Sequence, residues 1–208
     1  MKKIILAPFY ITYSLALIVG NYFYYDESYD SAVSYYDIAS KHPDGDSMYA
    51  EYNKASALYQ QGSYDSSSET LKNVIEKTGD ENLKQKSYYN LGNNYYRLGE
   101  ARIKSGKYAE GVSYWMRAIE EYRNSLKIDP EDVQAKENIE FIEELLKQAY
   151  IEMAKNITVT PTPSSKDTIQ QNEIEKIKAK EIENLKNYKI ESQMRNYDLS
   201  YEKEDKYW

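Results

Sequence analysis

The stretch that decides the fold is SYYNLGNNYYRLGEARIKSGKYAEGVSYWMRAIEEYRNSLKIDP, residues 87–130. It contains a leucine-glycine pair at Leu91-Gly92, a glycine at Gly106 and a closing Asp129-Pro130. The chain has only 8 glycines and 5 prolines, and they lie at such points rather than scattered. This distribution predicts long helices joined by short turns, because glycine and proline interrupt regular structure.

Two earlier segments share the pattern of this stretch. The aligned positions are a small residue (Gly20, Ala55, Gly92), an aromatic residue four places later (Tyr24, Tyr59, Tyr96), a tyrosine that starts the second helix (Tyr29, Tyr64, Tyr108) and a small residue after it (Ala32, Ser67, Gly111). Small residues in both helices are expected where the two helices cross closely. We therefore expect Gly92 to face Gly111. The turn glycine is present at Gly62 and Gly106, and Glu27 replaces it in the first segment.

This pattern resembles the tetratricopeptide repeat (TPR), a helix pair of about 34 residues. The predicted fold is an all-α TPR helical-repeat solenoid with three helix pairs, the third elongated, and a capping helix. The expected TPR domain covers 17–155, with repeats at 17–46, 47–80 and 85–130 and the capping helix at 131–155.

The third repeat is longer than the others. Gly92 lies 14 positions before Gly106, whereas Ala55 lies 7 positions before Gly62. An equal excess follows Trp115, so both helices are expected to be longer by about two turns. The added residues are expected to pack on each other, with Leu98, Ala101 and Ile103 facing Val112, Ile119 and Tyr122. We interpret the elongated pair as a projecting hairpin and a candidate docking element.

Asp129 and Pro130 are expected to start the capping helix as its N-cap and first helical residue. The apolar residues of that helix form one predicted stripe: Ile139, Ile142, Leu145, Leu146, Ala149 and Met153.

The N-terminus has two lysines followed by an uncharged run from Ile4 to Tyr25. Three interpretations remain open: a signal peptide, a membrane anchor and a buried helix of a soluble domain. Ser14 and Ala16 are suitably small for a signal cleavage site, so residues 1–16 are the expected signal or the start of an anchor. The repeat would then begin near Leu17. The first two interpretations place the body of the chain across a membrane, as an exported protein.

The composition argues against several functions. The net charge is −7 without a long basic run, which is unsuited to neutralising phosphates, so we expect no nucleic-acid partner. The chain has no cysteine and one histidine, His42, so a thiol nucleophile, a catalytic triad or a zinc site is not expected. Acidic pairs such as Glu120-Glu121 are neighbours on a helix and point in different directions. We predict no catalytic residue, no cofactor and no metal.

The C-terminal quarter differs in composition from the repeats. Residues 156–168 are rich in proline, serine and threonine and are expected to form a linker. Residues 169–208 carry alternating charges with few apolar residues, which is typical of a charged helical or disordered tail. The terminal Tyr207 and Trp208 are candidate contacts for the pocket of a partner.

The first helix of each TPR pair is expected to line a concave groove. The candidate partner-binding residues on these helices are Tyr52, Tyr59, Tyr89, Asn93, Tyr96 and Arg97. Aromatic walls with amide and guanidinium donors suit an extended peptide. Tyr59 and Tyr96 have an alternative role, in which they pack between repeats.

Three segments together resemble the TPR proteins of the Bat (aerotolerance) operons: YYNLGNNYYRLGE, YWMRAIEEYRNSLKIDPED and VQAKENIEFIEELL. The ending is similar to the short Glu-Lys-Asp-Trp signature of this family, but Asp205 precedes Lys206 and Tyr207 stands before Trp208. The resemblance implies an exported, non-catalytic scaffold, periplasmic or anchored in the inner membrane. Its implied partners are membrane-anchored von Willebrand A-domain proteins, in a stress-tolerance system with a MoxR-type ATPase. The alternative function is an envelope assembly factor that binds outer-membrane or cell-wall components.

Overall fold

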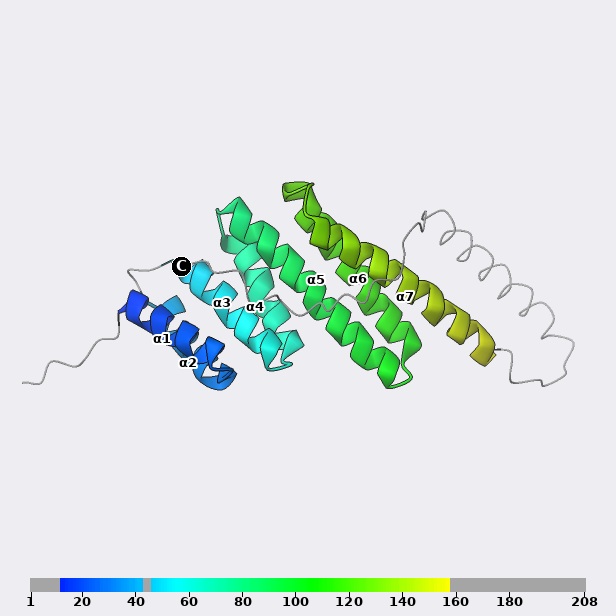
Figure 1. The fold of residues 1–208 in the computed structure, drawn as a ribbon, viewed down its shortest axis with the longest axis horizontal. Coiled ribbons are helices and arrows are strands. Elements are labelled where there is room, and N and C mark those ends of the chain that lie inside the picture. Colours follow the sequence, from blue (N-terminus) through cyan, green and yellow to red (C-terminus); the bar gives the residue numbers. More distant parts are fainter. Residues whose placement is uncertain (1–11, 43–45, 158–208) are drawn as a thin grey trace, which may run out of the picture. The chain divides into compact units, whose positions relative to one another are not determined.

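The computed structural model describes residues 12–42 and 46–157. These residues form helices and turns only (Figure 1). The helices are α1 (Tyr13–Tyr25), α2 (Tyr29–Ser40), α3 (Ser47–Gln60), α4 (Tyr64–Lys77), α5 (Glu81–Lys104), α6 (Tyr108–Ile128) and α7 (Val133–Ile157). The expected all-α fold of three helix pairs followed by a further helix is confirmed.

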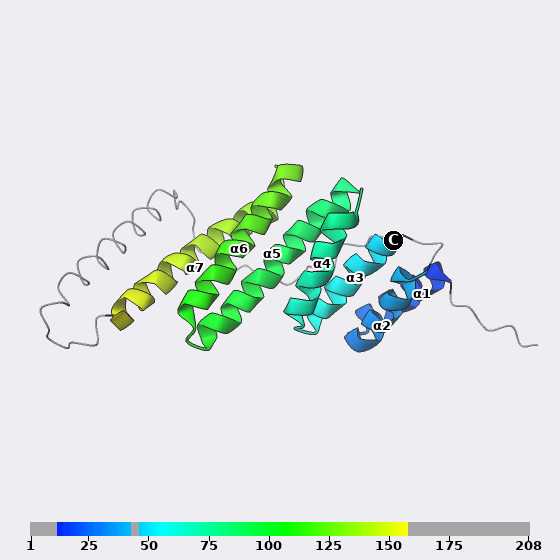
Figure 2. The same cartoon turned by 180° about the vertical axis from the view of Figure 1, so that it is seen from behind.

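The chain divides into two compact units at Asn94 and Tyr95, inside α5. In the first unit, α1 to α4 lie beside one another in chain order, and the view from behind shows the same order (Figures 1 and 2). In the second unit, α7 packs against α6. Helix α5 contributes its first residues to one unit and its last residues to the other.

All three helix pairs have the same turn. Its defining hydrogen bonds are from the amide of Ser28 to the carbonyl of Phe23, from Ser63 to Leu58 and from Lys107 to Arg102, each 2.9 Å long. This is the bond that closes a helix with a left-handed residue. That residue is Glu27, Gly62 or Gly106, with φ of 58°, 78° and 77°. Glu27 therefore occupies the glycine position of the turn.

The core of the first unit is built from small residues. Ala16, Ala39 and Ala50 form one fully buried cluster. A second cluster consists of Ala32, Tyr36 and Ala57. The Tyr36 ring fills the space beside Gly20, where an added Cβ would lie 2.7 Å from it. Small side chains let these helices approach closely, and the one large ring occupies the remaining space.

In the third pair, the glycine that meets Gly111 is Gly99. A Cβ added at Gly111 would lie 2.9 Å from the carbonyl oxygen of Gly99 and 2.6 Å from the Ile103 side chain. A Cβ added at Gly99 would lie 2.4 Å from Trp115. The predicted pairing of Gly111 with Gly92 is therefore wrong, because the crossing lies seven residues further along α5.

The shared turn explains why the helices of the third pair cross at Gly99. The crossing residue precedes the turn residue by seven positions in every pair: Gly20 and Glu27, Ala55 and Gly62, Gly99 and Gly106. Leu91-Gly92 repeats the pair Leu98-Gly99 one heptad earlier. A heptad is almost two full helical turns, so the two pairs lie on nearly the same side of the helix.

The extra length of the third pair lies away from its turn. Helices α5 and α6 have 24 and 21 residues, against 12 to 14 in α1 to α4, so the predicted elongation is confirmed. The added residues precede Gly99 in α5 and follow Gly111 in α6. The sequence predicted the added residues of α5 between the crossing and the turn at Gly106, and this placement is therefore wrong. Leu98, Val112, Ile119 and Tyr122 are buried as expected, whereas Ala101 is exposed.

The last described helix starts later than predicted. Asp129 accepts a hydrogen bond from the amide of Glu131 at 3.1 Å within a turn, and α7 begins at Val133. The capping carboxylate is that of Asp132, which accepts from the amide of Ala135 at 3.0 Å. The predicted N-cap at Asp129 is therefore wrong. Asp129 accepts a hydrogen bond within the turn, and Asp132 is the residue that caps α7. Ile142, Leu146 and Ala149 are buried as expected, and Ala135 and Asn138 join them.

Helix α1 begins at Tyr13, and the Thr12 hydroxyl caps it by accepting from the amide of Leu15 at 3.3 Å. The predicted cleavage position after Ala16 thus lies inside a helix. Across residues 12–42 and 46–157, no helix combines the length and the apolar content needed to span a membrane. The segment 1–11, the linker 158–168 and the tail with Tyr207 and Trp208 lie outside the described residues.

Candidate partner-binding surface

One side of α3 carries three tyrosines at helical spacing, Tyr49, Tyr52 and Tyr59, which we call the tyrosine face. Tyr49 is exposed, while Tyr52 and Tyr59 are half-buried. Positions separated by three and seven residues lie on one side of a helix, so the three rings form a row. Tyr49 was not among the residues predicted from the sequence, although the same spacing could have identified it.

Each ring of this row is held by a neighbour. The Tyr49 hydroxyl donates to a carboxylate oxygen of Asp80 at 2.6 Å, and this hydrogen bond raises the pKa of Tyr49 to about 12. The other oxygen of Asp80 caps α5 by accepting from the amides of Asn82 and Leu83, at 2.8 and 3.1 Å. The Tyr49 hydrogen bond also lowers the pKa of Asp80. One carboxylate thus fixes both the end of the row and the start of α5.

Tyr52 is held by α5. Its hydroxyl accepts a hydrogen bond from the amide nitrogen of Asn90 at 3.0 Å. Asn93, one of the predicted donors, is 4% exposed, and Tyr89 is half-buried. Asn93 therefore offers almost no surface to a partner, whereas Tyr52 and Tyr89 retain part of theirs.

A buried polar chain links α5 to α4 and α3. Asn94 donates to the Ser67 hydroxyl at 2.9 Å, and Ser67 donates to the carbonyl of Ala55 at 2.7 Å. Among the described residues, the Oδ1 atoms of Asn90 and Asn94 are buried without a hydrogen-bond partner. An unpaired buried acceptor costs about 1–3 kcal/mol, so this chain contributes more to the alignment of α5 on α3 and α4 than to stability.

Tyr59 packs at the end of its own helix pair. Its ring meets Tyr64 edge-on at 5.3 Å between centroids, and Tyr24 meets Tyr29 in the same way at 5.7 Å. The predicted equivalence of Tyr96 with these two residues is wrong, because the turn places Ile103 at that position in the third pair. The amide of Gly106 donates to Ile103, as the amide of Gly62 does to Tyr59.

Tyr96 belongs to an aromatic cluster of the second unit. It is 8% exposed and stacks on Trp115, with centroids 6.5 Å apart and planes at 13°. Phe141 of α7 also contacts its ring, at 5.9 Å. The Trp115 indole donates to the Tyr96 carbonyl at 3.2 Å. Tyr96 is thus a packing residue, as its alternative role had it.

Two arginines of the second unit lie against tyrosine rings. Arg97 is half-buried, 5.7 Å from the Tyr96 ring centroid and 3.4 Å from the Glu100 carboxylate. Arg117 lies over the Tyr95 ring at 4.2 Å and donates to its hydroxyl at 2.7 Å. These cations are held against aromatic faces, where the ring quadrupole stabilises them.

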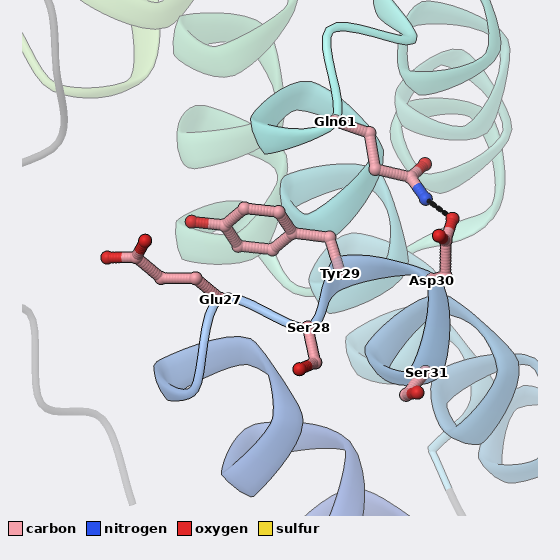
Figure 3. A pocket seen from close by; sticks show the side chains of 6 residues that line it. All are labelled: Glu27, Ser28, Tyr29, Asp30, Ser31 and Gln61. Atoms are coloured by element: carbon pink, nitrogen blue, oxygen red, sulfur yellow. Dashed lines mark hydrogen bonds between the residues drawn. The ribbon is translucent and has the colours of Figure 1, made fainter.

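An open pocket of roughly 340 Å³ lies at the turn between α1 and α2. Its lining side chains are Glu27, Ser28, Tyr29, Asp30, Ser31 and Gln61 (Figure 3). Gln61, from the end of α3, points to Asp30 and donates to its carboxylate. Burial and the neighbouring Glu27 raise the pKa of Tyr29. With two carboxylates and no basic side chain in the lining, the pocket suits a donor or cationic group.

The sequence-based prediction does not include this pocket. A signal for it exists, since Ser28-Tyr29-Asp30-Ser31 recurs as Ser63-Tyr64-Asp65-Ser66 at the start of α4. The repetition indicates a shared turn, but it does not indicate which copy is lined by a neighbouring glutamine.

Lys54 precedes the crossing residue Ala55, at the position that Val19 and Leu98 occupy in the other two helix pairs, and the structure shows its contacts. Its ammonium lies 2.8 Å from the Asp37 carboxylate of α2 and 3.6 Å from Glu51. Lys41 also pairs with Asp37. Hydrogen bonds from Lys41 and Lys54 lower the pKa of Asp37. An ion-pair network thus replaces an apolar contact between α2 and α3.

The chain was compared with known proteins. No protein-family model matches it. It is similar to heat shock protein STI1 of Saccharomyces cerevisiae, with 27% identity over 111 residues, which cover 51% of this chain and 17% of STI1. The chain therefore spans only a small part of this relative's length. Among solved structures it is similar to the TPR2AB domain of yeast Sti1 in complex with pHSP90, with 25% identity and a TM-score of 0.53. That likeness covers 68% of this chain and 50% of the other. Together with the three identical turns, these likenesses show that the chain has a TPR-like helical-repeat fold.

Proposed function

We propose that this chain is a non-catalytic protein-interaction scaffold that binds an extended partner segment along the tyrosine face of α3. The observation that carries this proposal is the fixed row of Tyr49, Tyr52 and Tyr59, whose hydroxyls or rings are held by Asp80, Asn90 and Tyr64. Aromatic side chains that are already ordered lose little conformational entropy on binding. The similar solved structure is a complex of yeast Sti1 with pHSP90, which supports a protein partner.

The proposed partners are von Willebrand A-domain proteins of the bacterial envelope, in a stress-tolerance system linked to a MoxR-type ATPase. This part of the proposal rests on the resemblance of residues 17–155 and the chain's last eight residues to the TPR proteins of the Bat operons. It places the chain in the periplasm, with either a cleaved signal or an inner-membrane anchor at the N-terminus. The aromatic ending, Tyr207 and Trp208, is the proposed second contact.

The test is recovery of partners from a bacterial envelope extract with the full chain immobilised. The variant carries Tyr49→Ala and Tyr52→Ala, and the control is Met116→Ala, an exposed residue of α6. We expect A-domain proteins to be recovered with the unmodified chain and the control, and recovery with the variant to fall at least tenfold. Circular dichroism verifies that each protein keeps its helical content.

Three outcomes would contradict parts of the proposal. Equal recovery with the variant would show that the tyrosine face is not the binding site. Recovery of outer-membrane or peptidoglycan material in place of A-domain proteins would favour an envelope assembly factor. Removal of residues 167–208 tests the tail, and unchanged recovery after that deletion would exclude Tyr207 and Trp208 as a contact.

A further inference from the structure

Helix α5 contains an internal repeat at heptad spacing. Residues 88–92 read YYNLG and residues 95–99 read YYRLG, so the two segments differ only at Asn90 and Arg97. They point in nearly the same direction from the helix, because seven residues fall only about 20° short of two full turns. Neighbouring helices could therefore dock on either segment, and the two docked positions differ by about 10 Å along the helix axis. We call these two positions the registers of α5.

Two buried asparagines dock the first segment on α3 and α4. Asn90 donates to the Tyr52 hydroxyl at 3.0 Å, and Asn94 donates to the Ser67 hydroxyl at 2.9 Å. Asn90 and Asn94 are 9% and 0% exposed. Each pairs through its nitrogen, and its Oδ1 atom is buried without a partner among the described residues. Because buried unpaired acceptors oppose folding, a gain in stability does not account for the two asparagines.

The internal repeat fails at the places that these asparagines occupy. In the alternative register, Arg97 would stand in the place of Asn90, and its guanidinium would be buried. Ala101 would stand in the place of Asn94 and has no donor for the serine hydroxyl. Asn90 itself would enter the place of Leu83, which is 2% exposed. The two asparagine hydrogen bonds thus form in the observed register and not in the alternative one.

We propose that Asn90 and Asn94 are positioning residues that fix the register of α5 on α3 and α4. Buried polar residues select one register of packed helices when their hydrogen bonds form in that register alone, and the selection costs stability. The unpaired Oδ1 atoms are this cost. Because Asn90 holds Tyr52, the same residues keep the tyrosine face in order. The register is a property of the chain alone, so its tests are independent of partner recovery.

Other contacts also favour the observed register. Asp80 caps the start of α5. The alternative register would lose this cap and would lengthen the connection from α4 from three residues, 78–80, to ten, 78–87. We therefore expect the alternative register as a minor population even without the asparagines. A covalent trap suits this case, because it collects a minor population over time.

The first test traps the alternative register as a disulfide. The sequence contains no cysteine, so an introduced pair reports a single contact. The pair is Ser67→Cys with Ala101→Cys, because these positions would meet in the alternative register. In the observed register Ala101 lies about 10 Å beyond Asn94 along α5, which is too far for a disulfide. The sulfur at position 67 remains a weak acceptor for Asn94.

The test variant adds Asn90→Leu and Asn94→Ala to this pair. The matched control adds Ser87→Ala, which removes a buried polar group of the same helix. The Ser87 hydroxyl donates to the carbonyl of Leu83 within α5 at 2.7 Å, so it does not select a register. Under mild oxidation in dilute solution, the intramolecular disulfide of the asparagine variant should exceed that of the serine control by about fivefold or more. Circular dichroism verifies that both proteins keep their helical content.

The second test uses hydrogen exchange and needs no cysteine. In the alternative register, residues 81–87 leave α5 and join the connection, so their amides lose the protection of the helix. Mass spectrometry should show these amides exchanging about tenfold faster in the asparagine variant than in the serine control, with α4 unchanged. Adding Arg97→Asn and Ala101→Asn moves the asparagines by one heptad and should increase this exchange further.

Two results would overturn the proposal. The first is a disulfide yield and an exchange rate of residues 81–87 that are equal in the asparagine variant and the serine control. The second is exchange that rises equally in α4 and α5 without a disulfide, which would show that the asparagines only stabilise the fold. An excess of the disulfide supports the proposal. Faster exchange at 81–87 alone supports it if moving the asparagines increases that exchange, and otherwise counts against it.

Discussion

Glu27 is the residue with the most unfavourable backbone conformation among the described turns. Its φ of 58° is left-handed, and the two equivalent positions are occupied by Gly62 and Gly106. A side chain in this conformation costs about 1 kcal/mol or more, because Cβ approaches the following carbonyl oxygen. We expect Glu27→Gly to raise the free energy of unfolding by about 0.5–1 kcal/mol, after allowance for the extra freedom of glycine in the unfolded chain. Urea denaturation followed by circular dichroism measures the change.

The matched control for this prediction is Gly62→Ala, which adds a side chain at the equivalent position. No atom lies within 4 Å of the added Cβ, so the effect reports backbone conformation alone. Its free energy of unfolding should fall by about 1 kcal/mol. If both variants were as stable as the unmodified chain, the left-handed turn would not carry the strain assigned to it.

Asp37 gives a prediction for pH dependence. Hydrogen bonds from Lys41 and Lys54 hold the pKa of its carboxylate below the ordinary value of 3.8 in the folded chain. A depressed folded pKa stabilises the protein above the unfolded pKa, and this contribution is lost as the pH falls through the folded value. Asp37→Asn should therefore reduce the free energy of unfolding at pH 7 by about 0.5–1 kcal/mol, a modest amount because the pair is partly solvated.

The measurement compares urea unfolding of Asp37→Asn and the unmodified chain at pH 7 and at pH 3. The difference between the two proteins should shrink at pH 3, which lies below the ordinary pKa of 3.8, because the contribution of Asp37 falls as the pH drops from that value toward the lower folded pKa. The other carboxylates contribute equally to both proteins. A difference that stayed constant with pH would show that the asparagine acts by altered packing rather than by lost charge.

Local features of single residues were predictable from the sequence, and contacts between helices were not. The position of Glu27 follows from its alignment with two turn glycines, because a turn is set by a few neighbouring residues. The role of Lys54 depends on Asp37, which lies on another helix. The alignment of Lys54 with Val19 and Leu98 shows that its charge is unusual at this position, but it does not identify Asp37 as its partner.

At the scale of the helix, α5 shows why the register could not be read from the sequence. Leu91-Gly92 and Leu98-Gly99 are a heptad apart, and a heptad changes the direction of a side chain by only about 20°. Both glycines therefore satisfy the pattern for a close crossing. The register is set by α6. Its Gly111 and Trp115 pack so closely on position 99 of α5 that only a residue without a Cβ fits there.

This register predicts that Gly99→Ala destabilises the α5–α6 pair. The added Cβ would lie 2.4 Å from Cδ1 of Trp115 and 2.9 Å from the carbonyl oxygen of Gly111. Forcing these atoms apart in a packed interior costs about 1–3 kcal/mol. The control is Gly79→Ala, where nothing lies within 4 Å of the added Cβ. Thermal unfolding of both variants measures the effect, and equal melting temperatures would argue against the crossing at Gly99.

At the scale of the molecule, α5 is the element on which both units depend. Its first part belongs to the first unit, where Asn90 donates a hydrogen bond to Tyr52 and Asn94 donates one to Ser67. Its last part makes the glycine crossing with α6. These two tasks account for a helix of 24 residues, where the sequence suggested a projecting hairpin. The length was predictable from spacing, but the division of contacts between the units was not.

The start of the first unit yields a prediction about processing of the chain. Thr12 caps α1, the Tyr13 hydroxyl donates to the carbonyl of Asp46 at 2.9 Å, and Ala16 is fully buried with Ala39 and Ala50. A chain that begins at Leu17 loses all three interactions and exposes the two remaining alanines. We expect its free energy of unfolding to be lower by about 2–4 kcal/mol than that of a chain that begins at Thr12.

Both shortened chains lack residues 1–11, so their comparison isolates residues 12–16 from any effect of the apolar N-terminal run. Urea unfolding measures the difference. A large difference would mean that signal cleavage after Ala16 removes part of the folded body, so that a cut compatible with this fold must come before Thr12. Equal stabilities would show that the first turn of α1 is dispensable, and cleavage after Ala16 would then be compatible with the repeat array.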